Sequence, residues 1–125
     1  MQSPRPDITD RSFRFARGVV IYCRRLDRTP GVNRTLATQL LRSGTSIGAN
    51  IKEAQAGQSR ADFVHKASVA CKEARETHYW LRLIESTDPK PTQELQDLLD
   101  EARQLALILT AIVRNTKANT ARHAA

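Results

Sequence analysis

The stretch from Leu36 to Gly57 constrains the fold of this chain more than any other part of the sequence. On an α-helix, which turns about 100° per residue, its apolar residues fall within about 60° of one another. They are Leu36, Leu40, Ile47, Ile51 and Ala54. Ala37, Gly44 and Gly48 form a strip of small residues along one edge of this apolar side. Each glycine costs a helix roughly 1 kcal/mol relative to alanine. We therefore expect Gly44 and Gly48 to serve close helix packing.

Three further segments show helical periodicity and are separated by turn residues such as Thr29-Pro30-Gly31. The sequence predicts helices over about residues 9–27, 32–57, 60–86 and 92–116. Short links between four amphipathic helices favour an all-α, antiparallel up-down-up-down four-helix bundle. We expect this bundle to occupy residues 9–116 as one domain. Residues 1–8 are expected to form a flexible lead-in, and residues 117–125 a flexible tail.

The length and composition exclude several classes of protein. The 125 residues, of which 40% are hydrophobic, are enough for one domain with a core of its own. No apolar run approaches the roughly 18 residues of a membrane span, and the N-terminus lacks the apolar core of a signal peptide. We therefore expect a cytoplasmic protein that does not enter the membrane. Cys23 and Cys71 have no metal-type spacing and are interpreted as reduced core residues.

Apolar residues outside the predicted core indicate self-association. The first helix is apolar over nearly half its circumference, and the third carries a cluster well away from its inner side. We expect an oligomer interface formed by Phe13, Val20, Val69, Tyr79, Trp80 and Leu83. Self-association into a homo-oligomer is the commonest use of such a surface.

The central motifs resemble a known family. The sequence QLLRSGTSIGANIKEAQAGQSRADF (39–63) is followed by KEARETHYWLRLI (72–84). Both segments closely resemble the bacterial four-helix bundle proteins encoded in intervening sequences of 23S rRNA genes. The resemblance implies assembly into a homopentameric ring, and this subunit number comes from the resemblance alone. The accessory variability determinant (Avd) of diversity-generating retroelements looks like a relative, and it is a basic pentamer that binds nucleic acid and a reverse transcriptase.

The polar residues give little support to catalysis. His65, His78 and His123 belong to no metal-binding pattern, and Ser43-Gly44-Thr45-Ser46 lacks the Gly-Lys-Ser/Thr ending of a phosphate loop. A second polar set consists of Asn50, Glu53, Glu73 and Glu76. Its carboxylates suit either a metal or acid–base site or a hydrogen-bonded network between helices. We favour the network, because no Glu here has the His three residues later that di-iron bundles use. We expect no enzyme activity, no metal and no cofactor.

The arginine-rich side of the first helix is the best functional candidate. It carries Arg11, Arg14, Arg17, Arg24, Arg25 and Arg28 in a chain with a net charge of +7. Arginine makes bidentate contacts with phosphate and keeps its charge at physiological pH. We expect this side to bind the backbone of RNA or DNA with weak sequence preference. The resemblance implies a role beside a reverse transcriptase or in RNA processing. Two alternatives stay open: a solvated basic face, and a protein-interaction scaffold that binds no nucleic acid.

Overall fold

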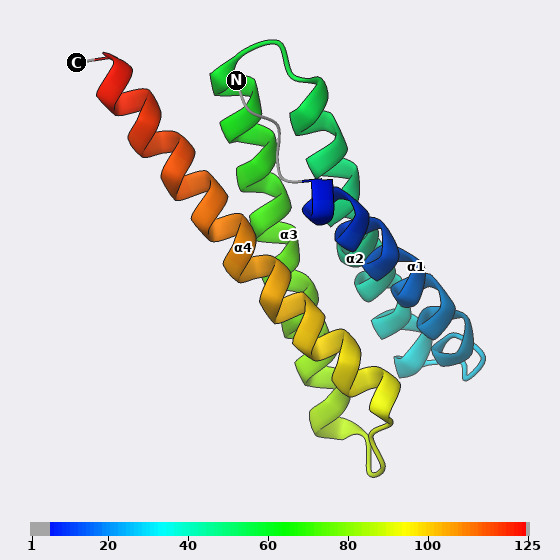
Figure 1. Cartoon of the computed structure of the whole chain (residues 1–125). Helices are drawn as coiled ribbons and strands as arrows, with labels where there is room; N and C mark the ends of the chain where they lie inside the picture. The colour runs from blue at the N-terminus through cyan, green and yellow to red at the C-terminus, as the bar shows by residue number, and fades with distance from the viewer. Residues whose placement is uncertain (1–5, 125) are drawn as a thin grey trace.

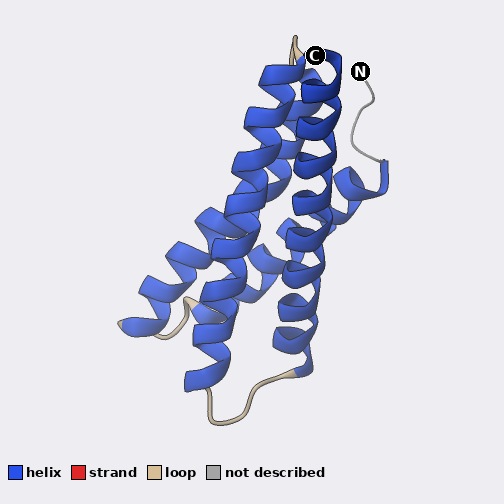
Figure 2. Cartoon of the chain, turned by 90° about the vertical axis from the view of Figure 1, so that its left-hand side faces the viewer, coloured by secondary structure: helices blue, strands red, loops and turns tan. Residues whose placement is uncertain are grey.

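The computed structural model describes residues 6–124 and contains four helices, α1 (Pro6–Leu26), α2 (Val32–Ala56), α3 (Arg60–Thr87) and α4 (Gln93–Ala124). Short loops join α1 to α2, α2 to α3 and α3 to α4, and consecutive helices lie side by side (Figure 1). The loops lie at the ends of the helices, and no strand occurs in the described part of the chain (Figure 2). The predicted all-α, four-helix fold is confirmed.

The apolar periodicity places the core between the helices. Each of α1 and α3 packs against both α2 and α4. The buried apolar side of α2 contains Leu40, Ile47 and Ile51 as expected, and small residues of α3 allow its neighbours to approach. The side of α3 that faces the core is buried and includes Phe63, Ala67, Ala70, Ala74 and Leu81.

Gly44 and Gly48 both face α1. Gly44 is buried, and a Cβ atom at Gly48 would lie 3.3 Å from the hydroxyl oxygen of Ser12 and 3.4 Å from its carbonyl oxygen. The lack of a side chain at these two positions therefore allows the backbones of α1 and α2 to approach closely.

The few buried polar side chains find partners within the bundle. The hydroxyl of Thr77 in α3 lies 3.0 Å from that of Ser43 in α2, at the centre of the interface between these helices. Among the described residues, no fully buried side-chain nitrogen or oxygen atom lacks a hydrogen-bond partner. This satisfies the requirement that a buried hydroxyl replace the hydrogen bonds it loses from water.

Local signals explain where α3 and α4 begin. The Ser59 hydroxyl caps α3 by accepting a hydrogen bond from the backbone N–H of Asp62 at 3.1 Å. The Thr92 hydroxyl accepts one from the backbone N–H of Leu95 at 3.2 Å. Gly31 precedes α2 with a φ of 92°, a conformation that glycine adopts without steric cost.

The outer boundaries differ from the prediction at both ends. α1 begins at Pro6, before the expected start at residue 9, and Ile8 is only 1% exposed within the core. Proline suits the first turn of a helix because the N–H it lacks would be unpaired there. α4 continues through Ala124 instead of ending near residue 116, because residues 117–124 contain no glycine or proline to stop it. The rest of the predicted lead-in and tail, residues 1–5 and 125, lies outside the described residues.

No helix within the described residues is long and apolar enough to cross a membrane.

Candidate nucleic-acid interface

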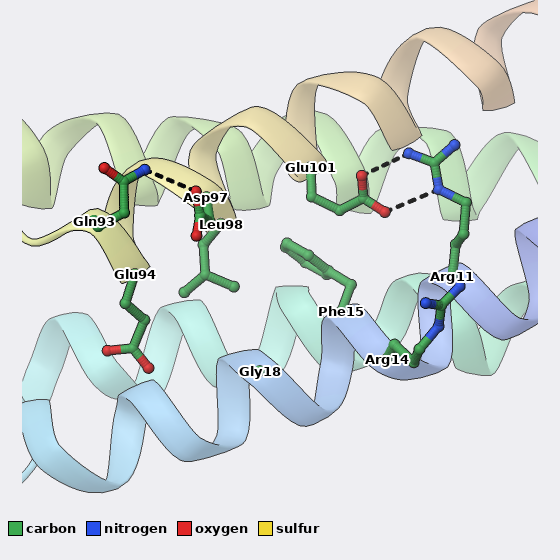
Figure 3. Close-up of a pocket in the computed structure, with 9 residues that line it drawn as sticks. All are labelled: Arg11, Arg14, Phe15, Gly18, Gln93, Glu94, Asp97, Leu98 and Glu101. Carbon is green, nitrogen blue, oxygen red and sulfur yellow. Dashed lines mark hydrogen bonds and ion pairs between the residues drawn. The ribbon is translucent and has the colours of Figure 1, made fainter.

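Three of the six predicted arginines of α1 are held in ion pairs. Arg11 reaches across to α4, where its Nε and Nη2 donate to the two carboxylate oxygens of Glu101 at 2.9 and 2.5 Å (Figure 3). Arg25 pairs with Glu94 of α4, and this hydrogen bond raises the pKa of the Arg25 guanidinium. Arg14 pairs with Asp10 one turn earlier in α1 at 2.8 Å. These carboxylates offset much of the positive charge on the α4 side of α1.

The other three arginines remain available to a ligand. Arg17, Arg24 and Arg28 are exposed, and none makes an ion pair with any described residue. Arg17 and Arg24, which are seven residues apart, lie on one side of α1, and Arg28 lies in the turn that follows the helix. We call these three residues the α1 arginine row. The structure thus divides the six predicted arginines into three that carboxylates neutralise and three that no described carboxylate neutralises.

The predicted polar set divides in a similar way. Glu73 and Glu76 of α3 both pair with Arg42 of α2, and Glu76 also accepts a hydrogen bond from Nε1 of Trp80 at 3.1 Å. This network ties α2 to α3 near their outer surface.

The two α2 members of that set lie apart from this network. The side-chain amide of Asn50 donates to the Ser46 carbonyl of its own helix at 2.8 Å. Glu53 is exposed and forms no ion pair within the described part of the chain. The sequence analysis did not place Arg42 in this polar set. Arg42 lies on the exposed side of α2, and nothing in the sequence indicates that carboxylates of α3 lie beside it.

The residues predicted to form an oligomer interface lie on two separate parts of the bundle. Phe13 on α1 is 69% exposed and Tyr79 on α3 is 59% exposed. The other four are half-buried, namely Val20, Val69, Trp80 and Leu83. The ring of Tyr79 meets that of Trp80 edge-on, with centroids 5.2 Å apart. Leu41 of α2, which the sequence did not single out, lines a surface hollow together with Val20 and adds to the α1 part.

A groove of about 750 Å³ runs between α1 and α4. Phe15 and Leu98 point into it (Figure 3), and Gly18 of α1 makes room for Leu98, since a Cβ atom at Gly18 would lie 3.3 Å from Cδ2 of Leu98. Its rims combine arginines of α1 with carboxylates of α4, including the Arg11–Glu101 pair that spans it. Because the charges of opposite sign lie side by side, this groove does not favour a polyanion.

The histidines and cysteines show no chemical site. Among the described residues, no group of three or more His, Cys, Asp or Glu side chains could hold a metal ion. His65 is exposed, and the side chain of His123 lies outside the described residues. Burial raises the pKa of the Cys23 thiol to about 11, with a smaller contribution from Asp27, so this thiol stays protonated and unreactive at neutral pH.

The sequence profile of the family described as 23S rRNA-intervening sequence protein matches residues 6–111. The chain belongs to this family. Its structure is also similar to the crystal structure of a protein of unknown function from the S23 ribosomal protein family of Bacteroides thetaiotaomicron. The two share 38% sequence identity with a TM-score of 0.77, over 86% of this chain and 95% of that one. No match was found among curated protein sequences. The resemblance of residues 39–63 and 72–84 to this family is thereby confirmed.

Proposed function

We propose that the protein binds the phosphate backbone of nucleic acid through the α1 arginine row. The observation that carries this proposal is that Arg17 and Arg24 of α1, and Arg28 in the turn after it, are exposed with no carboxylate partner in the described structure. Guanidinium groups in this state can exchange water for phosphate oxygens without first breaking an ion pair. The net charge of +7 adds attraction over a longer range. Contacts of this kind position a backbone and do not read bases.

RNA is the polyanion that we favour. The reason is that flexible single-stranded RNA can follow arginines spaced along a convex helix surface without a duplex having to bend. A relation to the accessory variability determinant, and a role beside a reverse transcriptase or in RNA processing, belong to the same proposal. In this proposal the protein is cytoplasmic and acts by binding, without catalysing a reaction.

We also propose that antiparallel four-helix bundles assemble into a homopentameric ring. The exposed aromatic rings of Phe13 and Tyr79 support self-association, because they leave apolar area in water that a second copy can cover. A ring brings several arginine rows onto one assembly, and weak contacts with a single strand then reinforce one another.

The rival function is a protein-interaction scaffold that binds no nucleic acid. The specific observation in its favour is the exposed Tyr79–Trp80 pair on α3, since Tyr and Trp are enriched at protein interfaces. Under this reading the arginine row serves solubility or an acidic protein partner.

The experiment that tests the proposal is purification without nuclease treatment, followed by a wash in rising salt and sequencing of the nucleic acid that remains bound. We expect RNA of varied sequence to be retained at low salt and released as the salt concentration rises. The wild-type protein should also bind added RNA at low salt. If no RNA is retained during purification and the protein does not bind added RNA, nucleic-acid binding is refuted and the protein-interaction scaffold is the remaining function.

A further inference from the structure

A second cationic surface lies between α3 and α4. A groove of about 390 Å³ there is lined by residues of both helices: Ser68, Cys71, Arg75, Thr110, Val113, Arg114 and Lys117. We call it the α3–α4 groove. Three of its lining residues are cations and none is a carboxylate. It differs in this respect from the groove between α1 and α4, where arginines and carboxylates alternate.

The three cations of the α3–α4 groove have no competing partners. Arg75, Arg114 and Lys117 are exposed, and none forms an ion pair with the residues that the structure describes. Like charges held around one hollow repel one another, so their proximity costs free energy that an anion would offset. Because Arg75 comes from α3 and the other two from α4, only the folded chain brings them together.

The uncharged residues of the groove add a hydrogen-bond donor. The Thr110 hydroxyl is occupied, since it donates to the Ala106 carbonyl at 2.7 Å and lies 3.3 Å from Sγ of Cys71. The half-buried Ser68 hydroxyl makes no hydrogen bond with any described residue. It is therefore free to donate to an oxygen of a bound group.

A second hollow lies along the same junction of α3 and α4, toward the other end of the helices. It contains His78 and Arg82 of α3 and Arg103 of α4, with Glu85 and Asp100 beside them. Arg103 pairs with Asp100 at 3.1 Å. The pKa of His78 is lowered first by burial and then by the nearby charges of Arg82 and Arg103. Because this hollow combines cations with carboxylates, as the groove between α1 and α4 does, it is not part of the proposed anion site.

We propose that the α3–α4 groove binds a phosphate group of a nucleic-acid backbone, through Arg75, Arg114, Lys117 and the Ser68 hydroxyl. This proposal deepens the nucleic-acid binding proposed above and rests on it. The groove is on a different part of the surface from the α1 arginine row, because α1 and α3 do not pack against each other. One copy therefore has two backbone contacts, and a bound strand that reaches both must pass around the bundle.

The test compares three variants of equal charge, each with three cations replaced by glutamine. The groove variant carries Arg75→Gln, Arg114→Gln and Lys117→Gln, and the row variant carries Arg17→Gln, Arg24→Gln and Arg28→Gln. The control variant carries Lys52→Gln, Arg60→Gln and Lys90→Gln, at positions that line neither site. Binding of a fluorescently labelled single-stranded RNA of arbitrary sequence is measured against salt concentration for each variant and for the wild type.

We expect the groove variant to bind RNA more weakly than the control variant does. The slope of log K against log salt should become shallower by about 0.7, because the groove holds one phosphate and the loss of one single-strand phosphate contact removes about 0.7. If the groove variant matches the control while the row variant loses affinity, the groove site is refuted and the proposed function stands. If the wild type binds no RNA at low salt, both proposals fail.

A second measurement needs no substitution. The NMR signals of Arg75, Arg114 and Lys117 are followed in the wild-type protein with and without the same RNA. A phosphate bound in the α3–α4 groove should shift the signals of these three side chains. Signals that saturating RNA leaves unchanged would overturn the groove site even if the groove variant fails to fold.

Discussion

A Cβ atom built on Gly44 of α2 would lie 2.9 Å from Cγ1 and 3.0 Å from Cγ2 of Val19 on α1. Val19 is fully buried, and its branched side chain has little freedom to move aside. The glycine that weakens α2 as an isolated helix is therefore a condition for packing α1 at this distance.

The first prediction follows from this contact. Replacing Gly44 with Leu should destabilise the protein by about 1–3 kcal/mol, because overpacking forces side chains off their rotamers or moves the backbone. Thermal or urea unfolding at fixed protein concentration measures the effect. Ala49→Leu, on the exposed side of the same helix, is the control and should change stability little. Equal losses for the two variants would show that the close contact with Val19 does not matter.

The helices and their inner sides were predictable from sequence because their signals are local. Periodicity in α2 and α3, and the Ser59 cap, depend on residues within a few turns of one another. The start of α1 was harder, because the buried Ser12 interrupts the apolar repeat that links Ile8 to Phe15. Ser12 fits there only because Gly48 lies opposite it, and this relation joins two helices.

The candidate sites were less predictable because their chemistry depends on contacts between helices. The arginines of α1 look alike on a helical projection, but α4 supplies carboxylates to Arg11 and Arg25 and none to Arg17. No sequence pattern within α3 or within α4 alone predicts the α3–α4 groove. Arg75 and Arg114 each resemble an ordinary solvated residue until packing places them around one hollow.

The second prediction concerns the hydroxyl pair between α2 and α3. Thr77 donates either to Ser43 or to the Glu73 carbonyl of its own helix, at 3.0 and 2.7 Å. Thr77→Val keeps the shape and removes the hydroxyl, and should cost about 1 kcal/mol. Adding Ser43→Ala should cost less than it does in the wild type, because the partner of Ser43 is already absent. Strict additivity of the two losses in unfolding free energy would contradict a coupled pair.

The third prediction tests assembly. We expect a homopentamer in light scattering or native mass spectrometry at micromolar concentration. Tyr79→Asp should reduce the assembled fraction, because it places a charge within the proposed interface. Leu107→Asp on α4 is the matched control, since Leu107 is 56% exposed, similar to Tyr79, and lies outside that interface. A monomeric wild type, or equal effects of the two substitutions, would refute the proposed assembly.

The fourth prediction concerns pH. His78 faces Arg82 and Glu85 of its own helix and Gln96, Asp100 and Arg103 of α4, and its pKa in the folded protein lies below the ordinary value of 6.5. The unfolded chain therefore binds a proton at a higher pH than the folded chain does. Stability should fall as the pH drops from 6.5 through the folded-state pKa.

His78→Gln should remove this part of the pH dependence in thermal unfolding. His65→Gln, at an exposed position of the same helix, serves as the control. If His78→Gln leaves the fall in melting temperature below pH 6.5 as steep as in the wild type, a lowered pKa of His78 does not cause that fall.

The last prediction separates the α1 arginine row from its paired neighbours. Replacing Arg17, Arg24 and Arg28 with Gln retains good helix formers and removes three charges that no described carboxylate balances. RNA affinity should fall similarly for unrelated sequences, and the slope of log K against log salt should become shallower by about 0.7 for each lost contact. A site that reads bases would instead lose affinity for one sequence more than for others.

The matched control for the row is a double variant of the same helix, Arg14→Gln with Arg25→Gln. Those guanidinium groups already pair with Asp10 and Glu94, so a phosphate would have to displace a carboxylate to reach them. Their loss should therefore weaken RNA binding less per charge than loss of the row does. Light scattering on every variant checks that assembly is unchanged, because an arginine at a subunit interface would alter binding indirectly. A row variant that assembles as the wild type does, and binds RNA with the same affinity and salt slope, would remove α1 from the interface.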